Sequence, residues 1–156
     1  MSNQRSVLGA IVALVLTFGA AYVGSRFPVD EWYSALAKPS WNPPNWLFGP
    51  VWSVLYLLMA ISVWLVWRKE GLLGAIVPLI IFLLQLVLNA AWSWLFFGLH
   101  ELGYAFVEIV ALWVAIVVNI ILFWRINPIS GILLLPYLAW VTFASVLNYT
   151  IWRLNM

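Results

Sequence analysis

Residues 32–46, WYSALAKPSWNPPNW, form the only long segment of this 156-residue chain that is not plainly a membrane span. They include three tryptophans, one tyrosine and three prolines. Proline fixes φ and drives the residue before it toward extended geometry, so one continuous helix is excluded here. The segment is expected to be a stiff connector that holds flat aromatic rings beside a membrane surface.

The composition on both sides of this connector is that of an integral membrane protein. The chain is 66% hydrophobic and 8% charged, with a mean hydropathy of +1.05. Soluble domains have about a quarter of their residues charged, so these few charges could not cover a water-facing surface. The lysines and arginines are spread near the span ends without forming a basic cluster, which argues against nucleic-acid binding.

Five segments are long and apolar enough to cross a hydrocarbon core of about 30 Å, which needs roughly 20 helical residues. The predicted spans are residues 7–25, 44–67, 78–97, 103–124 and 128–152. The first lacks a clear cleavage site and is expected to be a retained span rather than a signal peptide. The predicted fold class is an all-α integral membrane protein, one domain over residues 1–156. Its five helices form a single bundle, and short later connections predict that sequential helices are neighbours.

Polar and small residues at helical spacing are expected to mark the inward face of each span, because polar groups are costly in lipid. The first span has a small-residue stripe, which indicates close helix packing. The stripes of the other spans are Trp52, Tyr56, Met59 and Val63; Gln85, Asn89 and Ser93; Glu108, Leu112, Ala115 and Asn119; and Trp140, Ala144 and Asn148. Two interpretations of the amides stay open: hydrogen bonds between helices, or the lining of a ligand site.

Few residues offer chemistry of their own. His100, the one histidine, is expected to be a solvated loop residue, and without cysteine or clustered carboxylates it predicts neither a metal site nor a haem axial ligand. Glu108 is expected near the interface or paired with a neighbouring helix. Pro50 and Pro136 lie inside predicted spans and indicate kinks, Pro50 near the side of the first loop and Pro136 nearer the opposite side.

Two tryptophans lie deeper in their spans than an interfacial aromatic belt requires. Trp52 and Trp140 are several residues inside the second and fifth spans, and small Ala144 follows Trp140 by one turn. A large flat ring beside a gap suits a planar apolar ligand that stacks on aromatic faces.

Several motifs, in this order and spacing, resemble the TspO/MBR family of tryptophan-rich sensory and translocator proteins. They are WY at 32–33, KPSWNPP at 38–44, GPVW at 49–52, LNAAW at 88–92, PYLAW at 136–140 and LNY at 147–149. The resemblance implies a five-helix bundle, commonly a homodimer, whose first loop acts as a lid over a pocket. The implied ligands are tetrapyrroles such as protoporphyrin IX and haem, synthetic benzodiazepine-site ligands and, in some members, cholesterol.

The resemblance also implies which residues line that pocket. They are Tyr33, Pro43, Trp52, Asn89, Trp140, Ala144 and Asn148. In some bacterial members the positions of Trp52 and Trp140 are linked to light-dependent breakdown of protoporphyrin, and both tryptophans are present here. Lys38 and Arg26 are the nearest candidates in the sequence to pair with ligand propionates.

A proposed sterol motif is present near the end of the last span. Leu147, Tyr149 and Arg153 have its residue types at permitted spacings. Helix periodicity limits this interpretation, because Leu147 and Tyr149 project from different faces.

The sequence therefore predicts a multi-pass receptor or sensor for tetrapyrroles and related planar hydrophobic molecules. Two alternatives are a porphyrin or sterol transporter and a light-dependent porphyrin-degrading enzyme. No cofactor is expected to be required, since porphyrin or haem would be a ligand. The expected partners are the lipid bilayer, the ligand and a second copy of the chain. The expected location is the bacterial cell membrane or, in a eukaryote, the mitochondrial outer membrane.

Overall fold

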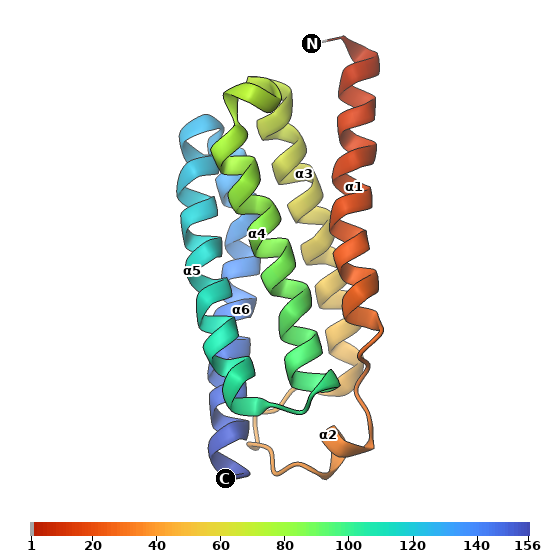
Figure 1. Cartoon of the computed structure of the whole chain (residues 1–156), viewed down its shortest axis with the longest axis vertical. Helices are drawn as coiled ribbons and strands as arrows, with labels where there is room; N and C mark the ends of the chain where they lie inside the picture. Colours follow the sequence, from red (N-terminus) through yellow and green to blue (C-terminus); the bar gives the residue numbers. More distant parts are fainter. Residues whose placement is uncertain (1) are drawn as a thin grey trace.

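The computed structural model describes residues 2–156 and contains, over that range, helices and loops only. Its long helices are α1 (Asn3–Ser25), α3 (Phe48–Gly74), α4 (Ile76–Ser93), α5 (Leu102–Ile126) and α6 (Pro128–Leu154). In the first loop lie α2 (Glu31–Ala35) and the 3-10 helix η1 (Asn45–Leu47), and the π-helix η2 (Trp94–Gly98) extends α4. Figure 1 shows the long helices side by side, with α2 across one end. Five helical units are long and apolar enough to cross a membrane, which confirms the predicted fold class.

The turn between the second and third spans differs from its prediction. The sequence predicts that the second span covers residues 44–67, but α3 continues past the charged run to Gly74. Gly71 adopts a φ of 70°, which glycine tolerates without a Cβ clash, so the helix is kinked there instead of ending. The next helix starts at Ile76, which places Pro78 in the first turn, where its missing N–H costs little.

The two prolines predicted to kink spans behave differently from each other. Pro50 is the third residue of α3, so it lies in a first turn whose N–H groups have no intrahelical partner anyway. The predicted internal kink at Pro50 is therefore wrong, and the geometry changes earlier, in η1. Pro136 does lie inside α6, which continues through it as one helix.

The order of helices around the bundle is α1, α3, α6, α5, α4. The prediction that short connections make sequential helices neighbours is correct for α4 with α5 and for α5 with α6. It is wrong for α3 and α4, which touch each other far less than each touches α1. The long first loop allows α1 to insert between them.

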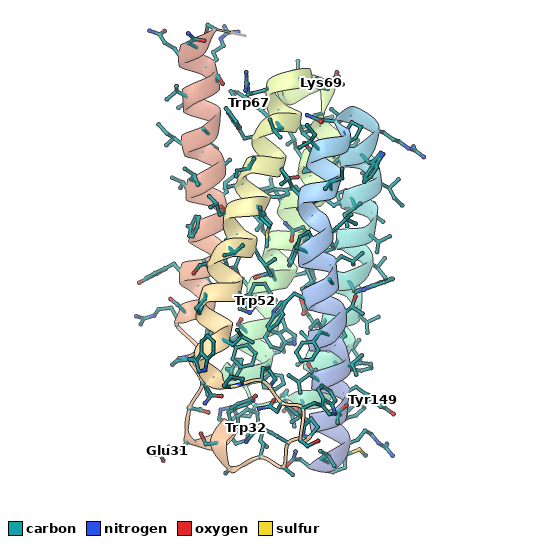
Figure 2. The ribbon with its side chains drawn as sticks, turned by 180° about the vertical axis from the view of Figure 1, so that it is seen from behind. Glu31, Trp32, Trp52, Trp67, Lys69 and Tyr149 are labelled. Atoms are coloured by element: carbon teal, nitrogen blue, oxygen red, sulfur yellow. The ribbon has the colours of Figure 1, made fainter. Side chains whose placement is uncertain are left out.

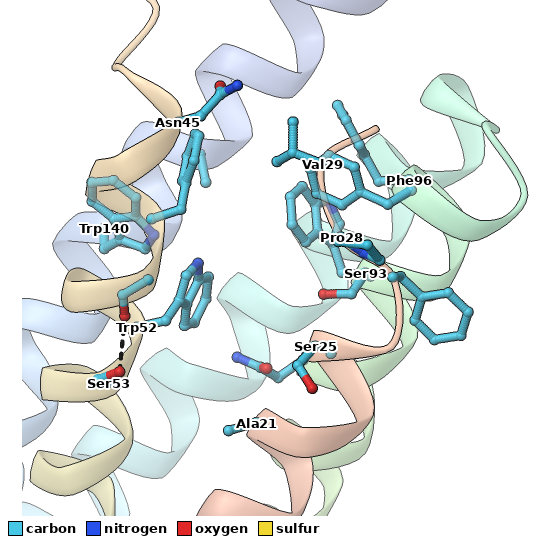
Figure 3. Close-up of a pocket in the computed structure, with 18 of the residues that line it drawn as sticks. Ala21, Ser25, Pro28, Val29, Asn45, Trp52, Ser53, Ser93, Phe96 and Trp140 are labelled. Carbon is cyan, nitrogen blue, oxygen red and sulfur yellow. Dashed lines mark hydrogen bonds between the residues drawn. The ribbon is translucent and has the colours of Figure 1, made fainter. Parts of the chain in front are cut away.

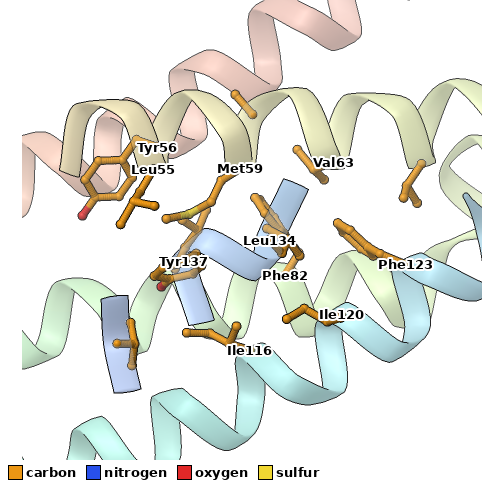
Figure 4. Packing of buried hydrophobic residues seen from close by; sticks show 14 of the residues in the cluster. Leu55, Tyr56, Met59, Val63, Phe82, Ile116, Ile120, Phe123, Leu134 and Tyr137 are labelled. Carbon is orange, nitrogen blue, oxygen red and sulfur yellow. The ribbon is translucent and has the colours of Figure 1, made fainter. Parts of the chain in front are cut away.

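A chain of hydrogen bonds joins α3, α4 and α6 in the interior. The Tyr56 hydroxyl donates to Asn89 Oδ1 at 2.5 Å, and Asn89 Nδ2 donates to the Tyr137 hydroxyl at 2.9 Å. The Tyr137 hydroxyl donates in turn to Gln85 Oε1 at 2.7 Å. All four residues are buried, and Figure 4 shows both tyrosines in the core. The stripe amides of α4 thus bond between helices, as one of the two interpretations requires.

The α1 helix lies directly against Trp67 of α3 at Gly9. A Cβ at Gly9 would lie 1.8 Å from Trp67 Cζ3, whereas a Cβ at Gly19 would meet nothing within 4 Å. We expect Gly9→Ala to displace the Trp67 ring and to lower the free energy of unfolding by about 1–3 kcal/mol, as at other overpacked sites. Thermal unfolding of the purified protein measures the effect. Gly19→Ala, the same change in the same helix, should not lower Tm; equal losses from both variants would contradict this account.

Candidate functional site

The half of the bundle nearest the first loop contains a cavity of about 650 Å³. Its lining comes from α1, the first loop, α3, α4, η2 and α6. Almost half of the lining residues are aromatic, and none of those that the structure describes is charged. Small-molecule sites of about 300–1,000 Å³ are typically apolar with a few directed polar groups, and this cavity has that character.

Two tryptophans on neighbouring helices face the cavity. Trp52 of α3 meets Tyr137 edge-on with ring centroids 6.2 Å apart, and Trp140 of α6 meets Phe48 edge-on at 6.1 Å. Figure 3 shows both indoles beside the open space. Neither indole N–H has a hydrogen-bond partner among residues 2–156, so both donors are available to a bound molecule.

The two predicted asparagines line the cavity, but their polar atoms are already engaged. Asn89 bonds with Tyr56 and Tyr137, as described above. Asn148 Oδ1 accepts from Trp92 Nε1 at 3.0 Å, and its Nδ2 donates to the Leu102 carbonyl at 3.0 Å. These amides therefore join helices, as one of the two interpretations requires, and they also form part of the cavity wall; their contact with a ligand stays a prediction.

The structure brings together most of the residues implied by the family resemblance. Those that line the cavity are Tyr33, Trp52, Asn89, Trp140, Ala144 and Asn148. Pro43 does not line it. A turn closed by the Asn42 N–H and the Pro39 carbonyl precedes Pro43, and it is Asn45 and Phe48, farther along, that reach the cavity. Contact of any of these residues with a ligand stays a prediction.

The first loop is attached to the bundle on one side through α2 and η2. The Tyr33 ring packs on Phe97 with centroids 5.5 Å apart, and Trp32 stacks on His100 at 3.9 Å and 8°. His100 Nε2 also lies 3.3 Å from Asp30 Oδ2. His100 is exposed in its loop, as predicted, and in addition it contacts the first loop through Trp32 and Asp30. Its partners lie about 70 positions earlier, so local sequence could not reveal the contact.

On the other side, the loop is attached to α6. The Ala37 N–H donates to Asn155 Oδ1, and Asn155 Nδ2 donates to the Ala37 carbonyl, both at 2.9 Å. Trp41 meets Phe143 edge-on with centroids 5.8 Å apart. The loop is thus a lid with two attachment sites, one on η2 and one on α6.

Neither basic residue predicted to pair with ligand carboxylates lines the cavity. Lys38 Nζ donates to the carbonyls of Tyr33 and Leu36 at 2.8 and 2.9 Å, and so closes the end of α2. Arg26 is exposed at the end of α1. Any charged group on a bound ligand would have to lie outside the apolar part of the cavity.

The other predicted residues lie away from a common site. Leu147 lines the cavity, whereas Tyr149 is 45% exposed and packs on Phe106, and Arg153 is exposed. The sterol motif is thus divided between two faces, as helix periodicity predicts. Glu108 lies outside the cavity lining, and both its carboxylate oxygens are buried without a hydrogen-bond partner among the described residues. Of the two predicted alternatives for Glu108, pairing with a neighbouring helix is not seen among the described residues, and an interfacial position stays a prediction.

The attachment of the lid to α6 can be tested with Asn155→Ala. This change removes both bonds to Ala37, and two hydrogen bonds of about 0.5–1.5 kcal/mol each predict amide exchange at residues 36–42 that is about tenfold faster or more. Hydrogen–deuterium exchange with mass spectrometry gives the measurement. Thr150→Ala, which removes only a bond within α6, is the control. Unchanged exchange in Asn155→Ala would show that these bonds do not hold the lid.

Tyr33 should make the lid sensitive to alkali. Burial raises the pKa of the Tyr33 phenol above its ordinary 10, against a smaller opposing effect of its hydrogen bond to Asn42. The folded state therefore favours the neutral phenol, so this contribution is complete below about pH 10 and is lost as pH rises through the raised pKa. We expect the Tm of wild type to fall more steeply above pH 10 than that of Tyr33→Phe. Exposed Tyr149→Phe should follow the wild-type curve; parallel curves for all three proteins would refute the assignment.

Comparison with known proteins agrees with this architecture. The TspO/MBR family profile matches residues 10–153. The chain is 41% identical to "Tryptophan-rich protein TspO" of Chlorobaculum tepidum over 99% of both chains, and 42% identical to "Translocator protein" of Homo sapiens over 86% of this chain and 82% of that one. It is 36% identical to "Tryptophan-rich sensory protein" of Cereibacter sphaeroides over 92% of each. A fold of five apolar helices and matches across nearly the whole chain lead to one conclusion: this protein belongs to the TspO/MBR family.

Proposed function

We propose that the protein is a membrane receptor or sensor that holds a planar, largely apolar molecule of the tetrapyrrole class in the aromatic cavity. The observation that carries this proposal is the pair of indoles, Trp52 and Trp140, on one uncharged cavity with their N–H groups free. Relatives named as sensory and translocator proteins support a sensing or translocating role in the membrane.

The chemistry of the lining supports a flat aromatic ligand over other apolar molecules. Aromatic faces and edges favour stacked or edge-on contact with another π-system, and each such pair contributes about 0.5–1.5 kcal/mol beyond the buried area. Protoporphyrin IX and synthetic benzodiazepine-site ligands offer such faces, whereas cholesterol does not. Among residues 2–156 the lining contains no His, Cys or Met, so haem would bind through its faces and edges rather than through an axial side chain.

Titration with protoporphyrin IX tests the proposal. Wild-type protein in detergent should bind with saturable quenching of tryptophan fluorescence. Trp52→Ala combined with Trp140→Ala should raise Kd about ten- to hundredfold, from the loss of two aromatic contacts. Binding by this double variant is measured by porphyrin absorbance, because the variant lacks two of the tryptophans whose fluorescence reports binding.

The matched control is Trp113→Ala. Trp113 is 36% exposed on α5, lies outside the cavity lining and bonds to Thr142. Its loss should leave Kd within about twofold of wild type. An equal Kd for wild type and the double variant would reject the cavity as the site.

One further function, light-dependent breakdown of the bound porphyrin, is favoured by the same pair of indoles. Trp52 and Trp140 are oxidisable side chains on the same flank of one cavity. If they take part, illumination of the complex should bleach the porphyrin bands faster than illumination of porphyrin mixed with a matched amount of free tryptophan. The double alanine variant should lose this excess bleaching. Equal rates in all three samples would leave binding as the only function supported.

A further inference from the structure

The cavity is open on one side, at the two ends of the first loop and the helix ends that they join. All of its exposed lining residues belong to α1, to the connector after it, to η1 or to the start of α3. Those from α4, η2 and α6 are buried or half-buried. We use "mouth" for the gap between the end of α1 and the start of α3, which is lined by Tyr22, Ser25, Asn45, Gly49 and Ser53. Figure 3 shows Ser25 and Ser53 on opposite sides of this gap, with Trp52 behind it.

The course of α1 explains why the gap exists. In its first half α1 lies tightly on α3, where Gly9 meets Trp67, and about two turns before its end Phe18 still contacts Tyr56 with centroids 6.2 Å apart. At its end α1 instead approaches α4, since a Cβ on Gly24 would lie 3.4 Å from Ser93 Oγ. The helix therefore leaves α3 as it nears the lid, and this divergence opens the mouth.

The lid is attached away from the mouth. Its attachments are the contacts of α2 with η2 and the bonds between Ala37 and Asn155 on α6. Neither involves α1 or α3. A molecule could thus pass between α1 and α3 while the lid stays attached.

The mouth also differs from the cavity in polarity. Hydroxyls of Tyr22, Ser25 and Ser53 and the amide of Asn45 surround it, and it lies at the ends of two spans, where lipid headgroups are expected. The side chains deeper in the cavity are mainly aromatic and uncharged. This gradient matches a flat molecule with one polar edge.

We infer that the ligand enters sideways from the bilayer through the mouth, without opening of the lid, and that its polar, carboxylate-bearing edge stays at the mouth. This inference rests on the proposed function and names the ligand class more closely: an amphipathic planar acid that is already dissolved in the membrane. Protoporphyrin IX is the probe for each test below.

The first experiment fixes the lid. The chain has no cysteine, so Ala37→Cys with Asn155→Cys allows a single disulfide or a short bis-maleimide bridge between residues that are already in contact. Stopped-flow mixing of porphyrin-loaded liposomes with proteoliposomes gives the association rate. The bridged and reduced forms should associate within about twofold of each other.

The second experiment fills the mouth. Gly49→Phe places a ring where a Cβ would meet nothing within 4 Å, so the helix itself should tolerate the change. Association and dissociation should both slow by at least tenfold, with Kd changed by less than threefold. Gly19→Phe, at another helical glycine with open space but outside the cavity lining, is the matched control and should leave both rates unchanged.

The third experiment places a charge at the mouth. Asn45→Arg should tighten binding of protoporphyrin IX by at least threefold at low salt and leave its dimethyl ester unaffected. An equal change for acid and ester would overturn the assigned orientation.

The outcomes separate this inference from the function on which it rests. Loss of association in the bridged lid, or unchanged rates in Gly49→Phe, would overturn sideways entrance while binding itself persists. A weaker Kd in Gly49→Phe caused only by faster dissociation would also overturn it, because the ring would then be occupying the site rather than its access. Absence of any porphyrin binding by wild type would remove both the proposed function and this inference.

Discussion

Within a bilayer, a polar side chain of the interior is costly unless it finds a partner inside the bundle, because lipid offers none. The chain from Tyr56 through Asn89 and Tyr137 to Gln85 meets this requirement across three helices. A shift of any one of these helices would break a hydrogen bond and leave a buried polar group without a partner, which costs free energy. These bonds therefore fix the relative positions of α3, α4 and α6, on which the remaining architecture depends.

The cavity begins where this chain ends. Tyr56 and Asn89 belong both to the hydrogen-bonded chain and to the cavity lining, so the floor of the cavity is made of groups whose positions are already set. Next to them the interior is rich in aromatic rings, several of which meet edge-on. A floor held in place by hydrogen bonds and walls rich in aromatic rings together bound the cavity.

The sequence predicts which polar residues face the interior, because this depends on helical periodicity and on the cost of placing polar side chains in lipid, both of which can be read from local sequence. Gln85, Asn89 and Asn148 were identifiable as inward-facing from spacing alone, and all three are buried. Contacts between distant segments were not predictable in this way. The helix α1 lies between α3 and α4, where Gly9 and Gly24 let it approach Trp67 and Ser93 closely. The stack of Trp32 on His100 joins two loops that share no local sequence pattern.

The same physical requirement decides which residues are free to act on a ligand. Trp92 lines the cavity beside Trp52 and Trp140, yet its N–H is bound to Asn148, whose own amide is bound to α5. Trp92 thus belongs to the framework, although its ring is part of the wall. Only the cavity indoles that make no hydrogen bond within residues 2–156, Trp52 and Trp140, keep an N–H that can donate to a bound molecule. A count of tryptophans in the sequence cannot make this distinction, since it depends on a bond between α4 and α6.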